Sequence, residues 1–158
     1  MSRKLLTGSF VALITPFNKD GSVDFAAFRA LLKFQQDNGT SAGLIMGSTG
    51  ETSMLAPEEK KQITIECAKM KTPAMPIFFG CTGNNTETTI ANVRFARDNG
   101  ADGAILAAPA YICAPESDIV GTTSPRLGLS QHITETPGLP ASTCATWPTR
   151  AVDSLCTT

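Results

Sequence analysis

Two ten-residue segments of the chain repeat the same chemistry. DNGTSAGLIM begins at Asp37 and DNGADGAILA begins at Asp98, and the two agree almost position by position in chemical character. Each is typical of a helix end, a glycine suited to a left-handed backbone, a tight loop and then a buried strand. A chain that reuses this unit alternates helices and strands. The repeat therefore predicts an α/β fold in which helices connect parallel strands.

Alternating strands and helices are predicted from the start of the chain to about Gly121. The predicted strands cover residues 8–15, 44–46, 75–80 and 103–108. The predicted helices run over 24–36, from 57 onward and over 86–97. Asp24 suits the N-cap of the first helix, Gly39 suits its left-handed end, and Pro57 suits the first turn of the second helix. Because the strands are apolar throughout, the parallel sheet is expected to be covered on both faces.

Two architectures fit this alternation. A doubly wound sheet would be complete at 158 residues, but its first turn is expected to be rich in glycine, whereas the first turn here is Thr15-Pro16-Phe17. A (β/α)8 barrel accounts for the hydroxyls and carboxylates that follow the strands, because barrel enzymes place their chemistry at the carboxyl ends of the strands. Such a barrel needs about 250 residues. The predicted fold class is therefore α/β, of the (β/α)8 TIM-barrel type, truncated to about the first four β/α units.

The net charge and the cysteine pattern indicate which kinds of molecule the chain could bind. A net charge of −1 and a pI of about 5.8 provide no basic surface for nucleic acid and no cationic face for a membrane. The five cysteines are scattered without a C-x-x-C pair, and the single histidine is His132, so a zinc site is not expected. Unpaired thiols, together with only a weak resemblance to a leader at the start, indicate a cytoplasmic protein. The expected partners are small molecules or other proteins.

Residues 47–55 read GSTGETSML and directly follow the second predicted strand. A phosphate-binding loop would require a lysine after its last glycine, and none follows Gly50. Serine, threonine and glycine after a strand often only form a turn and cap the next helix. Glu51 fits either a solvated loop carboxylate or a structural hydrogen-bond acceptor, and the second interpretation is favoured. Cys81 and Cys113 are predicted to be small buried residues or inert thiols.

Further short motifs follow one another along this part of the chain. They are GS and VALITPF (8–17), DGSVD (20–24), GSTGETSML with PEE (47–59), GCTGNNT (80–86), GADG (100–103) and PAY (109–111). Through their order and spacing, the stretch to about Gly121 resembles the N-terminal half of the dihydrodipicolinate synthase and N-acetylneuraminate lyase family of class I aldolases. The resemblance implies a TIM barrel that acts on pyruvate or another 2-oxo acid through a Schiff base, with no metal or organic cofactor.

The resemblance also implies roles for individual residues. In the family, the loop after the second strand holds the carboxylate of the 2-oxo acid through backbone N–H groups and hydroxyls, which here are those of Ser48 and Thr49. Gly47 and Gly50 would let the anion approach the backbone closely. Ser48 would also serve in a catalytic proton relay, at a position where family members often carry threonine. Tyr111 matches a tyrosine that reaches across a dimer interface to the neighbouring relay, which implies a homo-oligomer; by itself it fits a packing residue at the barrel rim.

Other family residues are missing from these 158 positions. The family forms its Schiff base on a lysine of the sixth strand and activates it with a tyrosine in a Tyr-Asn-x-Pro-x-Arg segment, but the last lysine here is Lys71 and no tyrosine follows Tyr111. Arg150 has no matching context for the arginine that receives the second substrate. The prediction is a dihydrodipicolinate synthase-like lyase or aldolase that is inactive as this chain, with its branch and second substrate left open. The alternative is a noncatalytic interaction module, a half-barrel that pairs with itself or with an aldolase subunit.

Residues 122–158 change in character. They are rich in Thr, Ser and Pro and show neither helical nor strand periodicity, so they are predicted to form an irregular tail outside the family domain of residues 1–121. The peptide Gly-Thr-Thr-Ser-Pro, from Gly121, can be encoded as GGC ACT ACT TCC CC, and the frame that begins at the third base encodes His-Tyr-Phe-Pro. The family expects His-Tyr-Phe or His-Phe in this region, which indicates a frame slip near Gly121.

If the tail is frame-slipped, restoring one base near codon 121 should open a reading frame of about 130 to 180 further residues, the length that a full barrel requires. That frame should encode Tyr-Asn-x-Pro-x-Arg and a lysine on a predicted strand. Sequencing the DNA from codon 115 onward is the measurement. A stop codon within a few residues in both other frames would contradict the frame slip.

Overall fold

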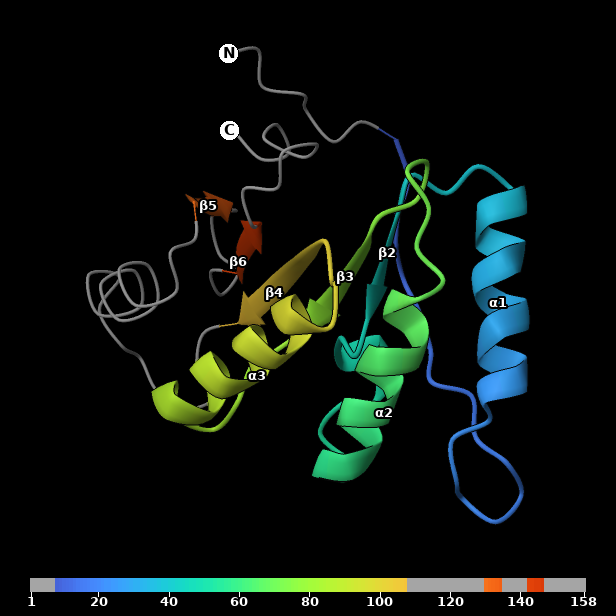
Figure 1. The fold of residues 1–158 in the computed structure, drawn as a ribbon, viewed down its shortest axis with the longest axis horizontal. Coiled ribbons are helices and arrows are strands. Elements are labelled where there is room, and N and C mark those ends of the chain that lie inside the picture. Colours follow the sequence, from blue (N-terminus) through green and yellow to red (C-terminus); the bar gives the residue numbers. More distant parts are fainter. Residues whose placement is uncertain (1–7, 108–129, 135–141, 147–158) are drawn as a thin grey trace.

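The computed structural model describes residues 8–107, 130–134 and 142–146 (Figure 1). Its strands are β1 (Phe10–Ala12), β2 (Ala42–Ile45), β3 (Ile77–Gly80), β4 (Gly103–Ala107), β5 (Ser130–Thr134) and β6 (Ser142–Thr146). Its α-helices are α1 (Phe25–Asp37), α2 (Pro57–Ala68) and α3 (Thr86–Asp98), and a short 3-10 turn, η1 (Ser48–Gly50), follows β2. Within these described residues, no helix is long and apolar enough to cross a membrane.

The first four strands are neighbours in the order in which they occur in the chain. β1, β2, β3 and β4 run parallel, with Leu44 level with Phe78 and Phe78 level with Gly103. The three helices that connect them lie on the same face of the sheet (Figure 1). Right-handed crossovers that never change direction place every helix on one face, whereas a doubly wound sheet reverses and carries helices on both. The strand order therefore fits the predicted barrel type, but the described helices do not cover both faces as the apolar strands had predicted.

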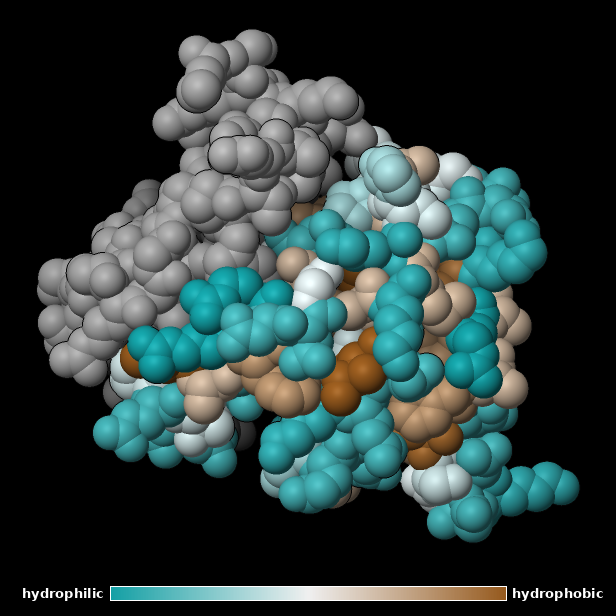
Figure 2. Space-filling view, viewed as in Figure 1, coloured by the Kyte–Doolittle hydropathy of each residue, from teal (hydrophilic) through white to brown (hydrophobic). Residues whose placement is uncertain are grey.

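The hydrophobic core lies between the helices and one face of the sheet. Alternate strand residues belong to it, and Ile45, Phe79 and Ala104 have no exposed surface. The helices contribute buried apolar residues to the same cluster: Phe28, Leu32, Ile63, Cys67, Val93 and Ala96. Figure 2 shows this side of the molecule, where hydrophobic residues are visible between the more hydrophilic outer surfaces of the helices. Burial of this one face is the main source of stability for the described part of the chain.

The opposite face of the sheet is also apolar. Phe10 of β1 packs against Phe78 of β3 with ring centroids 5.1 Å apart. Phe78 is buried, whereas Phe10 is 40% exposed and Ile14, which follows the same strand, is 55% exposed. When a sheet of this kind closes into a barrel, this face lines the interior and is filled with side chains.

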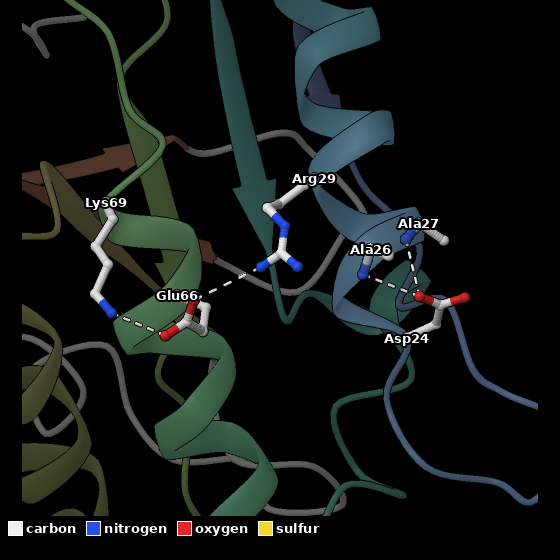
Figure 3. Close-up of polar contacts among 6 residues, drawn as sticks. All are labelled: Asp24, Ala26, Ala27, Arg29, Glu66 and Lys69. Carbon is white, nitrogen blue, oxygen red and sulfur yellow. Dashed lines mark hydrogen bonds and ion pairs between the residues drawn. The ribbon is translucent and has the colours of Figure 1, made fainter.

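Local signals begin and end the helices as the sequence predicted. Asp24 caps α1, because its carboxylate accepts hydrogen bonds from the N–H groups of Ala26 and Ala27, each at 2.9 Å (Figure 3). Gly39 follows α1 with a φ of +76°, so its predicted left-handed conformation is confirmed. Pro57 is the first residue of α2, where its missing N–H is not needed.

A surface ion pair joins α1 to α2. Glu66 of α2 lies 3.8 Å from the guanidinium of Arg29 on α1 and 2.8 Å from the ammonium of Lys69 (Figure 3). The hydrogen bond from Lys69 is the main reason why the pKa of Glu66 lies below its ordinary value. Exposed pairs of this kind contribute little to stability, so the core determines how these helices pack.

The end of β2 differs from the prediction. The predicted strand included Met46, but β2 ends at Ile45 and Met46 has a φ of 58°, which turns the chain away from the sheet. The carbonyl of Met46 lies so close to Gly80 on β3 that a Cβ at position 80 would overlap with it. This contact joins residues distant in sequence, so no local pattern around Met46 signals it.

The tail contains two strands that the sequence did not predict. β6 pairs antiparallel with β4 along its whole length, from Gly103 opposite Thr146 to Ala107 opposite Ser142, and β5 pairs with β6. The predicted irregular tail is therefore wrong for these two segments. Both segments contain β-branched residues, and the edge of β4 offers a row of unpaired backbone groups that favours pairing despite weak periodicity.

Gly80→Ala is expected to lower the free energy of unfolding by about 3 kcal/mol, because the new methyl group must displace the Met46 carbonyl. Gly43→Ala is the matched control, since a Cβ there would meet only side-chain atoms, at 3.6 Å and 3.9 Å. The control should change stability by about 1 kcal/mol or less. Urea denaturation followed by circular dichroism measures both, and equal losses in the two variants would contradict the contact.

Candidate functional site

Hydroxyl-bearing residues gather where the parallel strands end. Thr15 follows β1, Ser48 and Thr49 follow β2, and Thr82 follows β3. The carboxyl ends of neighbouring parallel strands lie at one edge of the sheet, where barrel enzymes carry their active sites. The hydroxyl of Thr15 donates a hydrogen bond of 2.7 Å to the carbonyl of Gly50, which ties the segment after β1 to the turn after β2.

The turn η1 has a defined backbone. The N–H of Gly50 donates to the Gly47 carbonyl at 3.0 Å, and the N–H of Glu51 donates to the Ser48 carbonyl at 3.1 Å. Ser48 and Thr49 are exposed, and no described residue accepts a hydrogen bond from their N–H groups or from their hydroxyls. The structure thus brings the predicted residues Gly47, Ser48, Thr49 and Gly50 together in one turn whose outer donors are available to a small anion.

Packing explains why position 50 is a glycine. Gly50 is buried, and a Cβ there would lie 3.1 Å from the carbonyl oxygen of Leu13 and 3.3 Å from Oγ1 of Thr15. The prediction gave Gly50 a role in ligand access; close approach to the segment after β1 is a separate reason for it. Thr15, only 4% exposed, was not predicted as a site residue. Its signal in the sequence was a threonine at the end of the predicted apolar strand, since a buried hydroxyl needs a partner.

Glu51 is an exposed residue in a left-handed conformation, with a φ of 54°. In the part of the chain that the structure describes, its carboxylate accepts no hydrogen bond. This matches the solvated loop carboxylate and not the favoured interpretation as a structural acceptor. The backbone of Glu51, and not its side chain, is the hydrogen-bond acceptor: its carbonyl accepts from the N–H of Met54 at 2.9 Å.

The cysteine that follows β3 is buried, as predicted. Cys81 is 3% exposed, and burial raises the pKa of its thiol to about 12. Its thiolate is therefore scarce near neutral pH. Tyr111 and Cys113, which the sequence also singled out, lie outside the described residues. Within residues 8–107 and the two tail strands, no group of three or more His, Cys, Asp or Glu side chains could hold a metal ion.

A separate cavity of about 290 Å³ lies between α2 and α3. One face of α2, with Lys60 and Thr64, and one face of α3, with Asn92 and Phe95, form its walls. Met46 contributes to its floor, but the residues of η1 do not line it. The predicted site is therefore the turn at the strand ends and not this cavity.

Sequential parallel strands and helices on one face define part of a (β/α)8 barrel, with a hydroxyl-bearing turn at the carboxyl ends of its strands. The model of the dihydrodipicolinate synthetase family matches residues 5–120. The chain belongs to this family, and the resemblance inferred from its motifs is confirmed.

Relatives of known identity match the same part of the chain. The 4-hydroxy-tetrahydrodipicolinate synthase of Syntrophotalea carbinolica is 39% identical over 107 residues, which are 68% of this chain and 36% of the relative. The crystal structure of dihydrodipicolinate synthase from Aquifex aeolicus superposes with a TM-score of 0.65 at 37% identity, covering 72% of this chain and 38% of that one. The chloride-inhibited dihydrodipicolinate synthase from Acinetobacter baumannii, complexed with pyruvate, gives a TM-score of 0.69 at 33% identity, covering 74% and 40%. The chain thus spans 36 to 40% of the length of these relatives.

Proposed function

We propose that the turn η1 binds the carboxylate of pyruvate or another 2-oxo acid. The observation that carries the proposal is that Ser48 and Thr49 are exposed residues and that no described residue accepts a hydrogen bond from their N–H groups or hydroxyls. Hydrogen bonds from such donors to a charged carboxylate are stronger than those between neutral groups. Family membership, and a relative crystallised with pyruvate, support the same class of ligand.

The reaction that this site would serve is that of a dihydrodipicolinate synthase-like lyase or aldolase. Holding the carboxylate fixes the neighbouring carbonyl carbon of the 2-oxo acid, at which the chemistry of the family takes place. We assign to Ser48 the movement of protons at that carbonyl, with Tyr111 as the second member of the relay. A Schiff base also requires an amine at the carbonyl carbon.

Five of the described lysines are poorly placed to provide this amine. Lys33, Lys60 and Lys61 belong to helices on the outer side of the sheet, and Lys69 ends α2. Lys71 donates to Asp102 at 3.1 Å, directly before β4 and so at the amino end of the sheet. In the proposal, this part of the barrel contributes binding of the 2-oxo acid but not the covalent step.

Pairing of two half-barrels is the alternative function, and it depends on open strand edges. Closure of a barrel uses both edge strands of the sheet. Here β6 covers the edge of β4 along all of its residues, so a second copy could not pair there without displacing β6. This observation favours the 2-oxo-acid site over closure by pairing, although a homo-oligomer formed through other surfaces is compatible with the proposal.

Pyruvate is expected to bind with a Kd on the order of 1 mM, because a few charge-assisted hydrogen bonds to a small anion in an open site provide about 4 kcal/mol. Titration should shift the amide NMR signals of residues 47–52. Thr49→Val, which keeps the shape and removes the hydroxyl, should abolish these shifts. Ser9→Ala removes an exposed hydroxyl just before β1, at the opposite end of the sheet, and should leave them unchanged. Signals of the turn that stay still in a well-dispersed spectrum would show that it does not bind pyruvate.

Incubation of the chain with pyruvate and borohydride should trap no covalent adduct at Lys33, Lys60, Lys61, Lys69 or Lys71, because these five lie on a helix, at the end of one or at the amino end of β4, and not on a strand. Mass spectrometry of the intact chain and of its peptides is the measurement. An active dihydrodipicolinate synthase treated in parallel provides the positive control. Stoichiometric pyruvyl labelling of a single one of these five lysines would overturn the separation of binding from covalent chemistry.

A further inference from the structure

The first end of η1 is held by packing against β3. Met46, which is 4% exposed, has a left-handed φ of 58°, and its carbonyl lies against Gly80 where no Cβ would fit. The backbone of β2 and β3 thus determines how the chain enters the turn.

The other end of η1 is held by a single side chain. The hydroxyl of Thr15 donates to the Gly50 carbonyl at 2.7 Å across a sequence separation of 35 residues, and both residues are buried. Because Gly50 follows Ser48 and Thr49 directly, the Thr15 bond limits where the donors of those two residues can lie. Without it, the buried carbonyl would lack its partner and the last residue of the turn could shift.

We propose that Thr15 is a positioning residue for the bound carboxylate. It does not touch the ligand; it fixes Gly50, and through Gly50 it holds the N–H groups and hydroxyls of Ser48 and Thr49 in the geometry that the carboxylate requires. The inference rests on the proposed function of η1. Several donors converge on one small anion, so a displacement of about 1 Å is enough to cost a large part of the affinity.

Thr64 provides a matched control for Thr15. Its side chain is equally buried, at 4% exposure, and its hydroxyl also donates to a backbone carbonyl, that of Lys60 at 2.8 Å. That carbonyl lies within α2 and not in the turn. Thr64→Val therefore controls for the loss of a buried threonine hydroxyl outside the turn, whereas a positioning role predicts that only Thr15→Val weakens binding.

The test measures the pyruvate Kd by amide NMR titration of the full chain and its variants. Thr15→Val should weaken binding about tenfold or more, while Thr15→Ser, which keeps the hydroxyl, and Thr64→Val should remain within about twofold of the original chain. Where Thr15→Val does not give a dispersed spectrum, Thr15→Cys replaces it, and its weaker donor should lower the affinity in the same direction. Equal affinities in Thr15→Val and Thr64→Val, or no rescue by Thr15→Ser, would overturn the proposal.

A second readout separates this inference from the proposed function. If the original chain binds no pyruvate, the proposed function fails. The role of Thr15 in holding the turn is then tested without ligand, by amide hydrogen exchange. The N–H groups of Gly50 and Glu51, which bond within the turn, should then exchange with solvent about tenfold faster in Thr15→Val than in Thr64→Val. Equal exchange rates in these two variants would overturn the positioning role independently of any ligand.

Discussion

The parallel pairing of β1 to β4 in chain order is the constraint on which the rest of the structure depends. Because each right-handed crossover adds its strand on the same side of the last, the carboxyl ends stand at one edge and the segments that follow them become neighbours. Thr15 can reach Gly50, and Met46 can pack on Gly80, only because β1, β2 and β3 are adjacent in this order. A reversal at any strand would separate the partners of these contacts.

The same order explains which parts of the structure could be predicted from the sequence. The cap at Asp24, the left-handed Gly39 and the start of α2 at Pro57 depend on neighbours within a few residues, so local patterns predict them. The turn of Ser48 and Thr49 was found through its motif. The bend at Met46 depends on Gly80, which is remote in sequence, and the strands of the tail depend on the free edge of β4. No local pattern carries such contacts.

The two faces of the sheet differ in what completes them. One face is finished by α1, α2 and α3, which bury Ile45 and Phe79 fully. On the other face, Phe10 and Ile14 retain large exposed fractions although apolar side chains gain by burial. In a complete barrel the remaining strands curve round to cover this face, so its apolar character comes from the barrel as a whole and not from the part described here.

Recognition of a carboxylate and covalent chemistry with an amine require different parts of the barrel. The donors of η1 are held by the packing of Met46 on Gly80 and by the bond from Thr15, and all of these residues lie within 8–107. An amine that attacks a 2-oxo acid must be held opposite that turn, on a strand that faces it across the barrel interior. Lys71, by contrast, is engaged with Asp102 at the amino end of β4. If η1 binds the carboxylate as proposed, separate elements supply the two functions, and the part of the barrel described here would bind a 2-oxo acid without itself forming the imine.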